Sequence, residues 1–211
     1  MEIHAPHEPV HSLRQMLTHL ALVTMGVLIA LSFEGIGTWR EHRALVREAR
    51  ANILSELSDN HNELENRLKG IVVEQKNIDE TIAVAQRLLE TKQLKGSVQL
   101  GFETADLRDA SRRTAEITGA FALMEYDEVK KYAELYSHQE LFMRTQADAM
   151  RDLARTMGVL NLLKYADRAS VRELEQWQMD LRAVLGDLTV EEGLGKKLLK
   201  DYEHVLEGKE P

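Results

Sequence analysis

The sequence predicts an all-α protein: an N-terminal transmembrane helix continues into a long coiled-coil-like stalk helix, and shorter helices fold back on it as an antiparallel bundle. Three observations predict this fold. The three prolines lie at positions 6, 9 and 211, so no proline interrupts a helix between Val10 and Glu210. Ala, Leu, Glu, Arg, Lys and Gln, which favour helix, dominate the 211 residues. Finally, the 19 residues between Arg14 and Glu34 include no Asp, Glu, Lys or Arg.

The composition excludes several functions. The chain has no cysteine, which rules out disulfides, thiolate metal sites and cysteine nucleophiles. Its net charge is -8, with acidic and basic residues interspersed. A nucleic-acid-binding protein would need a basic face to neutralise phosphates, so we expect no nucleic-acid partner.

We divide the chain into four segments. The boundaries are residues 1–12 for a disordered leader, 13–38 for the transmembrane anchor, 39–95 for the stalk helix, and 96–211 for a helical bundle segment that packs on the stalk. In the leader, His4, His7 and His11 have a spacing that could gather around a metal. Pro6 and Pro9 break any helix there, so we expect a mobile tail and no metal.

The anchor is centred on residues 17–36. As a helix these 20 residues span about 30 Å, the thickness of the hydrocarbon layer. Its hydroxyls, on Thr18, Thr24 and Ser32, can bond to the helix backbone and are therefore tolerable in lipid. Ser12 to Gln15 has the form of a capping box, and Trp39 is placed as an interfacial anchor.

Two alternatives to a membrane anchor are a cleaved signal peptide and the core helix of a soluble protein. A signal peptide carries a basic n-region and a small-residue cleavage site. Here Glu2 and Glu8 accompany a single Arg14, and SFEGIGTW offers no A-x-A pattern. Charge more often interrupts a core helix within about 10–14 residues. We therefore expect an uncleaved, single-pass signal anchor in the lipid bilayer.

The charges flanking the anchor predict its orientation. The C-terminal flank carries Arg40, Arg43, Arg47 and Arg50, whereas the N-terminal flank carries only Arg14. The positive-inside rule then places the C-terminal body in the cytoplasm, although histidines at 4, 7, 11 and 19 oppose this orientation.

One stripe of the anchor, formed by Gly26, Ala30 and Glu34, predicts a self-association face. Gly26-x-x-x-Ala30 is a small-x-x-x-small pair that lets two helices approach closely, although such pairs also arise by chance. Glu34 either reaches headgroup water or makes a polar contact between paired helices. A homodimer through the transmembrane and stalk helices is one expected assembly, and an unknown protein is a further expected partner.

The stalk has hydrophobic spacing of coiled-coil type over about five heptads. The predicted seam is Leu54, Leu57, His61, Leu64, Leu68, Ile71, Gln75, Ile78, Ile82, Ala85 and Leu89. It passes Gly70 without a register break, which favours one continuous helix. Helices folded back from residues 103–207 would cover this face, as would a parallel stalk dimer, and the two arrangements are compatible.

The remaining helices follow from caps and periodicity. We expect a loop at 95–101 with Gly96 as C-cap, a helix over about 103–118, and a long helix interrupted at Gly158. Its predicted seam is Ala122, Val129, Tyr136, Met143, Met150 and Met157, with Tyr126, Ala133, Ala147 and Ala154 beside it. The capping box Ser170–Glu173 opens a helix that ends at Gly186 and buries Val171, Leu174, Trp177, Leu181 and Val184. Thr189 caps a last helix that turns Val190, Leu194, Leu198 and Val205 inward.

No residue pattern predicts catalysis. Tyr126, Tyr132 and Tyr136 form an aromatic patch that we expect to pack its rings. Arg112–Arg113 could bind an anion, but Asp109 and Glu116 are nearby ion-pair partners, and Asp201-x-x-His204 only approaches a di-iron motif. Phosphate loops, nucleophile elbows and H-E-x-x-H are missing. We therefore expect no catalytic, cofactor-binding or metal-binding residues, and no enzyme.

Parts of the chain resemble a family of single-pass bacterial membrane proteins. The resemblance rests on Ala30-Leu31-x-x-Glu34 followed by Trp39, on Leu54-x-Glu56-Leu57-x-x-Asn60, and on FETADLRDASRRTAEITGAFALMEYDEVKKYAELY. It implies a protein of the bacterial inner membrane with a helical body. It implies no activity, because none is established for that family.

These features predict a membrane-anchored helical scaffold or interaction protein without catalytic activity. The alternative is a ligand-sensing helical-bundle module at the membrane. Sensor bundles usually return through a second transmembrane helix, and the sequence predicts only one. A deep polar cavity near Tyr132 or Arg112 would favour the sensing module.

Overall fold

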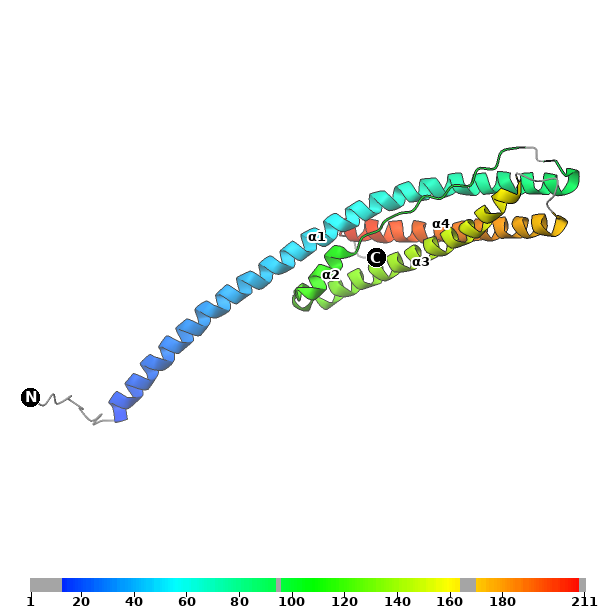
Figure 1. Ribbon diagram of the computed structural model, residues 1–211. Helices are drawn as coiled ribbons and strands as arrows, with labels where there is room; N and C mark the ends of the chain where they lie inside the picture. Colours follow the sequence, from blue (N-terminus) through cyan, green and yellow to red (C-terminus); the bar gives the residue numbers. More distant parts are fainter. Residues whose placement is uncertain (1–12, 94–95, 164–169, 209–211) are drawn as a thin grey trace, which may run out of the picture. The chain divides into compact units, whose positions relative to one another are not determined.

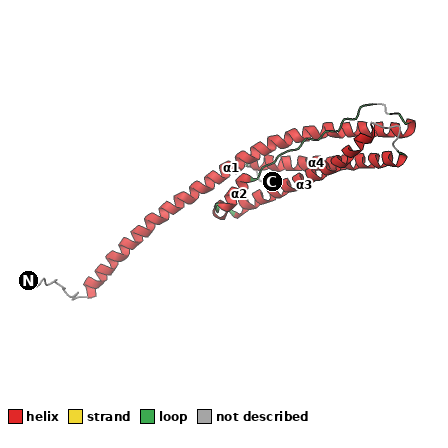
Figure 2. Ribbon diagram, in the orientation of Figure 1, coloured by secondary structure: helices red, strands yellow, loops and turns green. Residues whose placement is uncertain are grey.

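A computed structural model describes residues 13–93, 96–163 and 170–208 of the chain, and these residues form helices without any strand (Figures 1 and 2). The elements are α1 (Leu13–Thr91), α2 (Ala110–Ile117), the 3-10 turn η1 (Ala120–Leu123), α3 (Tyr126–Leu163) and α4 (Val171–Leu206). The predicted all-α fold is confirmed. Contacts divide the chain into two compact units, Met1–Glu48 and Ala49–Pro211. The leader histidines and the predicted cap at Ser12 lie outside the described residues.

Helix α1 passes through Gly70 without interruption, as the heptad pattern predicts. It ends earlier than expected, at Thr91, where Lys92 adopts a left-handed φ of 56°. The predicted cap residue Gly96 lies beyond this end, with a φ of 119°. A Cβ atom at Gly96 would lie 2.8 Å from Cγ2 of Val84, so glycine is needed here for both its conformation and its size.

The second unit is a bundle of the C-terminal half of α1 with α3 and α4 (Figure 1). Helix α3 runs parallel to α1, and α4 runs antiparallel to both. The contacts that fix these directions are Arg50–Glu128 and Tyr136–Glu56 between α1 and α3, and His61–Glu203 and Arg67–Glu191 between α1 and α4. The shorter helices therefore pack on the stalk, as predicted. Helix α4 has the predicted antiparallel direction, whereas α3 is parallel to the stalk.

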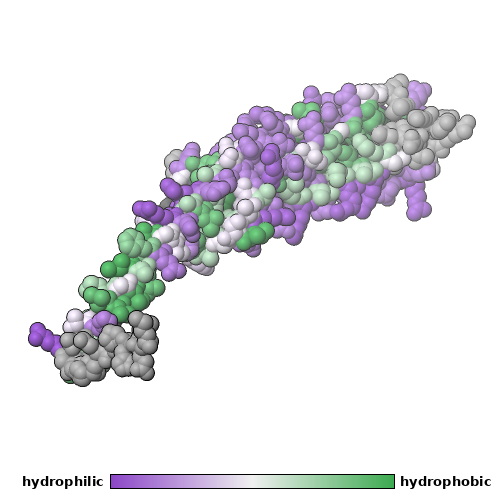
Figure 3. All heavy atoms as spheres, turned by 60° about the vertical axis from the view of Figure 1, so that its left-hand side comes forward, coloured by the Kyte–Doolittle hydropathy of each residue, from purple (hydrophilic) through white to green (hydrophobic). Residues whose placement is uncertain are grey.

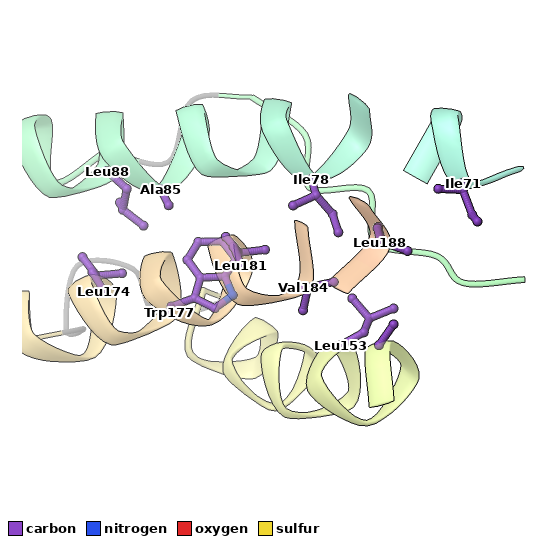
Figure 4. Close-up of a cluster of buried hydrophobic side chains, with 11 residues drawn as sticks. Ile71, Ile78, Ala85, Leu88, Leu153, Leu174, Trp177, Leu181, Val184 and Leu188 are labelled. Atoms are coloured by element: carbon purple, nitrogen blue, oxygen red, sulfur yellow. The ribbon is translucent and has the colours of Figure 1, made fainter. Parts of the chain in front are cut away.

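An apolar core fills one end of this bundle (Figure 4). Helix α1 contributes Ile71, Ile78, Ala85 and Leu88, helix α4 contributes Leu174, Trp177, Leu181, Val184 and Leu188, and α3 contributes Ala149 and Leu153. Of the residues predicted to be buried on α4, Leu174, Trp177, Leu181, Val184 and Leu198 are buried, and Leu194 and Val205 are half-buried. Val171 and Val190, also predicted to face inward, are exposed. Helices α1 and α4 thus bury one face each against the other.

The predicted seam of α1 is half right. Leu57, Leu64, Ile71, Ile78 and Ala85 are buried, as expected. The second buried row is not the predicted one at 54, 61, 68, 75, 82 and 89; it consists of Ile53, Asn60, Arg67, Glu74, Thr81 and Leu88. This row was missed because four of its members are polar.

The predicted register of α3 is wrong for the same reason. Tyr136 is buried, but Met150, Met157 and Tyr126 are exposed. The buried row is Tyr132, Leu135, Gln139, Phe142, Gln146, Ala149, Leu153 and Thr156. Gln139 and Gln146 interrupt its hydrophobicity, so a purely hydrophobic count favours the neighbouring row of methionines.

Several predicted helix ends also differ. Gly158 and Gly186 lie inside α3 and α4, and Thr189 bonds to the carbonyl of Leu185 within α4 instead of capping a separate helix. The capping box at Ser170 is confirmed: the Glu173 N–H donates to Ser170 Oγ at 3.2 Å, and the Ser170 N–H donates to Glu173 Oε2 at 2.9 Å. The helix expected over 103–118 begins only at Ala110, and residues 98–109 are neither helix nor strand.

Candidate functional site

The N-terminal part of α1 presents an apolar surface on all sides. An 18-residue window near the N-terminus has a mean hydropathy of 2.0, and none of it is buried. Its exposed side chains include Leu20, Leu22, Val23, Val27, Leu28, Ile29 and Leu31, which point in different directions around the helix. Figure 3 shows hydrophobic side chains gathered over this segment. This helix is long and apolar enough to cross a membrane.

The polar groups of this segment are arranged as the sequence predicts. The hydroxyls of Thr18, Thr24 and Ser32 donate to the carbonyls four residues earlier, at 2.7–2.8 Å. The guanidinium of Arg43 lies 4.5 Å from the ring centroid of Trp39. Both backbone-bonded hydroxyls and an aromatic–cation pair are suited to a membrane and its interface.

The predicted self-association face is exposed. Gly26, Ala30 and Glu34 all lie on α1 without covering side chains, and no atom comes within 4 Å of a Cβ built at Gly26. A second helix therefore has room to approach there.

In the second unit, residues 98–109 form a strap that runs back along the bundle (Figure 2). Its backbone bonds to side chains of both α1 and α3. Side chains of the helices form hydrogen bonds with the strap's backbone N–H and C=O groups, as a neighbouring strand would in a sheet. Gln146 accepts from the Ala105 N–H at 2.8 Å and donates to the Ala105 carbonyl at 3.0 Å. Asn60 bonds both backbone groups of Arg108 in the same way, at 2.9 and 2.7 Å. These buried amides therefore substitute for a sheet partner.

The carboxylates of α1 extend this arrangement. Glu74 accepts from the Glu103 N–H at 2.8 Å, and Glu56 accepts from the Ser111 N–H at 2.8 Å. Gln139 donates to the carbonyl of Arg108 at 3.0 Å. The buried polar rows of α1 and α3 thus hold the strap in place along its length.

A charged cluster lies at the centre of the bundle. Arg67 binds both oxygens of Glu191 on α4, at 2.8 and 3.1 Å, and Oε1 of Glu74 at 2.8 Å. The side chain of Arg67 is 1% exposed and that of Glu191 is 0% exposed. Burial raises the pKa of Glu191 even though Arg67 opposes the change. The Phe102 ring centroid lies 4.4 Å from the guanidinium, so this cluster joins α1, α4 and the strap.

The predicted tyrosine patch separates into three environments. Tyr132 and Tyr136 are buried, and their hydroxyls donate to Glu128 and Glu56. Burial raises the pKa of Tyr132 to about 12. Tyr126, in contrast, is 80% exposed. The expectation that these rings pack is therefore correct for two of the three.

Arg112 and Arg113 are paired as the sequence suggests. Both contact Asp109, at 3.1 and 2.8 Å, and Arg112 also contacts Glu116 at 3.3 Å. A polar hollow of about 470 Å³ adjoins Arg112 and Tyr136 on one side of α3. Since these arginines already have acidic partners, the hollow offers no uncompensated positive charge to an anion.

A second hollow, of about 220 Å³, lies between the first half of α3 and the end of α4. Its walls are mainly apolar, and Tyr132 is one of its lining residues. Asp201 and His204, the near-miss of the sequence, both line it. Asp201 contacts His138 Nδ1 of α3 at 2.9 Å. No three His, Asp or Glu side chains within 13–93, 96–163 and 170–208 come together as a metal site.

Comparison with protein-family models, with curated proteins and with solved structures finds no match for this chain. The resemblance of residues 30–60 and 102–136 to single-pass bacterial membrane proteins is therefore not confirmed as a family relationship. What the structure shows is that the described residues form helices, one of which, near the N-terminus, is long and apolar enough to cross a membrane.

Proposed function

We propose that the protein is a single-pass membrane protein whose residues 17–36 cross a lipid bilayer and whose helical body is a scaffold for protein interactions, without catalytic activity. The observation that carries the proposal is the apolar window in α1, of mean hydropathy 2.0, in which no residue is buried. A core helix of a soluble protein would have most of this surface covered.

The distribution of apolar side chains supports lipid as the covering medium. Leu20, Leu22 and Val23 point to different sides of the helix, and all three are exposed. A single partner helix covers only one stripe of a helix. A bilayer covers the whole circumference, which matches a segment that is apolar all round.

The C-terminal end of the span supports an anchor that is retained. Trp39, stacked with Arg43, has the chemistry of an interfacial residue. The segment SFEGIGTW lacks the small-residue pattern of a cleavage site. The uncleaved anchor is therefore the proposed form of the mature protein, in the inner membrane of a bacterium.

The proposed orientation places the body in the cytoplasm, on the basis of Arg40, Arg43, Arg47 and Arg50. The positive-inside rule counts basic residues near the span, so Arg50 counts even though it binds Glu128 at 2.6 Å. A reporter enzyme fused after Pro211 tests this, and periplasmic activity of the reporter would reverse the orientation.

The helical body supports a scaffold role. Its interior polar groups, such as Asn60, Gln139 and Gln146, bond to the strap and so serve the fold itself. Self-association of the anchor through Gly26, Ala30 and Glu34 is part of the proposal, because this face is open. Leu64, on the stalk seam, is buried by the chain's own helices, so copies would meet through the anchor or the outer face of α1.

Alkaline extraction of membranes, followed by intact-mass measurement, tests the anchor. We expect the chain to stay in the membrane pellet and to keep its N-terminal residues. Release into the supernatant would contradict the anchor, and loss of the first residues up to about position 38 would indicate a signal peptide. Co-purification from membranes then tests the scaffold role, which requires a reproducible protein partner.

The chain has no cysteine, so single cysteines can test self-association directly. We expect Ala30→Cys to form a crosslinked dimer in membranes. Leu31→Cys, one position away on the same exposed helix, is the matched control and should crosslink much less. Equal crosslinking at both positions would contradict a specific face.

A further inference from the structure

The hollow between α3 and α4 has properties that the scaffold role does not use. Its lining includes Tyr132 and Leu135 of α3 and Val205 of α4, which we call the floor. Tyr132 and Leu135 are largely buried, and the Tyr132 hydroxyl is engaged by Glu128 at 3.3 Å. The floor is therefore fixed in place and apolar, which suits the hydrocarbon part of a small ligand.

The acidic residues of the hollow already have basic partners. Glu128 binds Arg50 at 2.6 Å, and Glu134 lies 3.7 Å from Lys130. Asp201 contacts Nδ1 of His138 at 2.9 Å. These carboxylates are thus compensated by groups outside the hollow or on its wall.

His138 lies between Asp201 and the side chain of Lys197. Nζ of Lys197 lies 3.4 Å from Nε2 of His138. The positive charge of Lys197 therefore lies beside the His138–Asp201 pair and offsets the negative charge of Asp201.

Two basic residues that line the hollow have no such partner. Lys131 and His204 are both lining residues, and neither forms an ion pair within residues 13–93, 96–163 and 170–208. With each acid balanced, the remaining formal charge is the positive charge of Lys131. This charge lies beside an apolar floor.

We propose that this hollow binds a small organic anion with an apolar body, such as a carboxylate or sulfonate on a single aromatic ring. A cavity of about 150 Å³ holds benzene, so the volume of about 220 Å³ leaves room for one ring and an acidic group. Lys131 donates to the anionic group, His204 offers a second N–H donor, and Tyr132, Leu135 and Val205 contact the ring. This inference does not depend on the membrane anchor.

The probe is 4-fluorobenzoate, and its binding to the full-length protein in lipid nanodiscs is measured by fluorine NMR. Empty nanodiscs serve as the blank. A ligand of this size in a half-open site should bind with a Kd on the order of 1 mM. Lys131→Glu should weaken binding at least about tenfold. Lys76→Glu makes the same charge change at an exposed site on α1 that does not line the hollow, and should leave the Kd unchanged.

A second variant tests the cavity itself. Val205→Trp fills the hollow without removing Lys131 and should abolish binding, while far-UV circular dichroism checks that each variant remains folded. The uncharged probe fluorobenzene should bind with an affinity that Lys131→Glu does not change. The proposal is overturned if 4-fluorobenzoate does not bind the natural sequence at about 10 mM. It is also overturned if neither Lys131→Glu nor Val205→Trp weakens binding.

Discussion

Replacing Arg67 by methionine should destabilise the protein strongly, because the change leaves two buried carboxylates without a counter-charge. Arg67 makes three charge-assisted contacts of 2.8–3.1 Å to Glu191 and Glu74, whose side chains are 0% and 8% exposed. Methionine keeps much of the length of the side chain and removes its charge. The experiment therefore isolates the electrostatic contribution of the cluster.

The size of the loss follows from what the carboxylates can do instead. Removing one partner of a buried ion pair costs about 3–5 kcal/mol. A carboxylate can avoid this cost by binding a proton, which for an ordinary glutamate at pH 7 costs about 3.4 kcal/mol. We therefore expect a loss of about 3–5 kcal/mol, equivalent to a decrease in Tm of roughly 6–20 °C for a chain of this size.

Thermal unfolding of the full-length protein in detergent, followed by far-UV circular dichroism, measures this loss. Lys69→Met is the matched control, since Lys69 lies two residues away, is 66% exposed and pairs with Glu65 on the helix surface. Its effect should be below about 1 kcal/mol. Adding Glu191→Gln to Arg67→Met should restore part of the stability, because it removes one of the unpaired charges.

The pH dependence provides an independent check. Burial already raises the pKa of Glu191 in the folded protein. Without Arg67 that pKa rises further, so the folded variant binds more protons than the unfolded chain above the ordinary pKa of 4.5. The stability deficit of Arg67→Met should therefore grow as the pH rises from about 4.5 to 7. A deficit below about 1 kcal/mol, or one that does not vary with pH, would refute this reasoning.

Three further predictions concern packing and titration. Gly195→Leu should destabilise the bundle by about 1–3 kcal/mol in urea unfolding, because a Cβ at Gly195 would lie 2.9 Å from a neighbouring side chain. The control Gly193→Ala, at an exposed position, should stabilise the protein, and the opposite order of stabilities would contradict the packing. Asp187→Asn should raise the Tm at pH 7, since burial and the nearby Asp152 raise the pKa of Asp187 and so disfavour its charged form; a lower Tm would show that this carboxylate is stabilising. Burial raises the pKa of Tyr202 in the folded protein, so above pH 10 only the unfolded chain loses this proton and the protein becomes less stable. Tyr202→Phe should therefore reduce the loss of stability above pH 10 by about 1.4 kcal/mol per pH unit. If stability falls equally steeply with pH in both proteins, this assignment is contradicted.

Hydrophobic periodicity was sufficient to predict the class of fold and the continuity of α1. Leu57, Leu64 and Ile71 were placed correctly because they are both apolar and buried. The capping box predicted a helix start correctly where both of its residues are present at the required spacing, as at Ser170 and Glu173. These signals are local, so they do not depend on how the other helices pack.

The strap and its partners could not be predicted in the same way. Residues 103–109 favour helix by composition, yet they are neither helix nor strand because Gln146, Asn60 and Glu74 bond their backbone from distant helices. The same side chains lowered the hydrophobicity of the buried rows and shifted the predicted register of α3. One signal was available: polar residues at heptad spacing on α1, at 60, 67, 74 and 81, which indicate a buried polar row when the adjacent row is apolar.

The hollow at the end of α3 was also beyond sequence reasoning. His138 and Asp201 are 63 residues apart and meet only because α4 runs antiparallel to α3. The sequence singled out Tyr132 and His204 individually. It contained no pattern that brings them to one cavity.

The central claim is that residues 17–36 cross a bilayer, and cysteine-scanning accessibility tests it most directly. Single cysteines are introduced at each position from 14 to 42 of the cysteine-free chain and exposed in intact membranes to a water-soluble maleimide. The account predicts an unbroken protected stretch of about 20 residues, with labelling resuming by Glu41. Labelling throughout, or protection only at every third or fourth position, would mean that water or a protein partner covers this helix, and would contradict a membrane span.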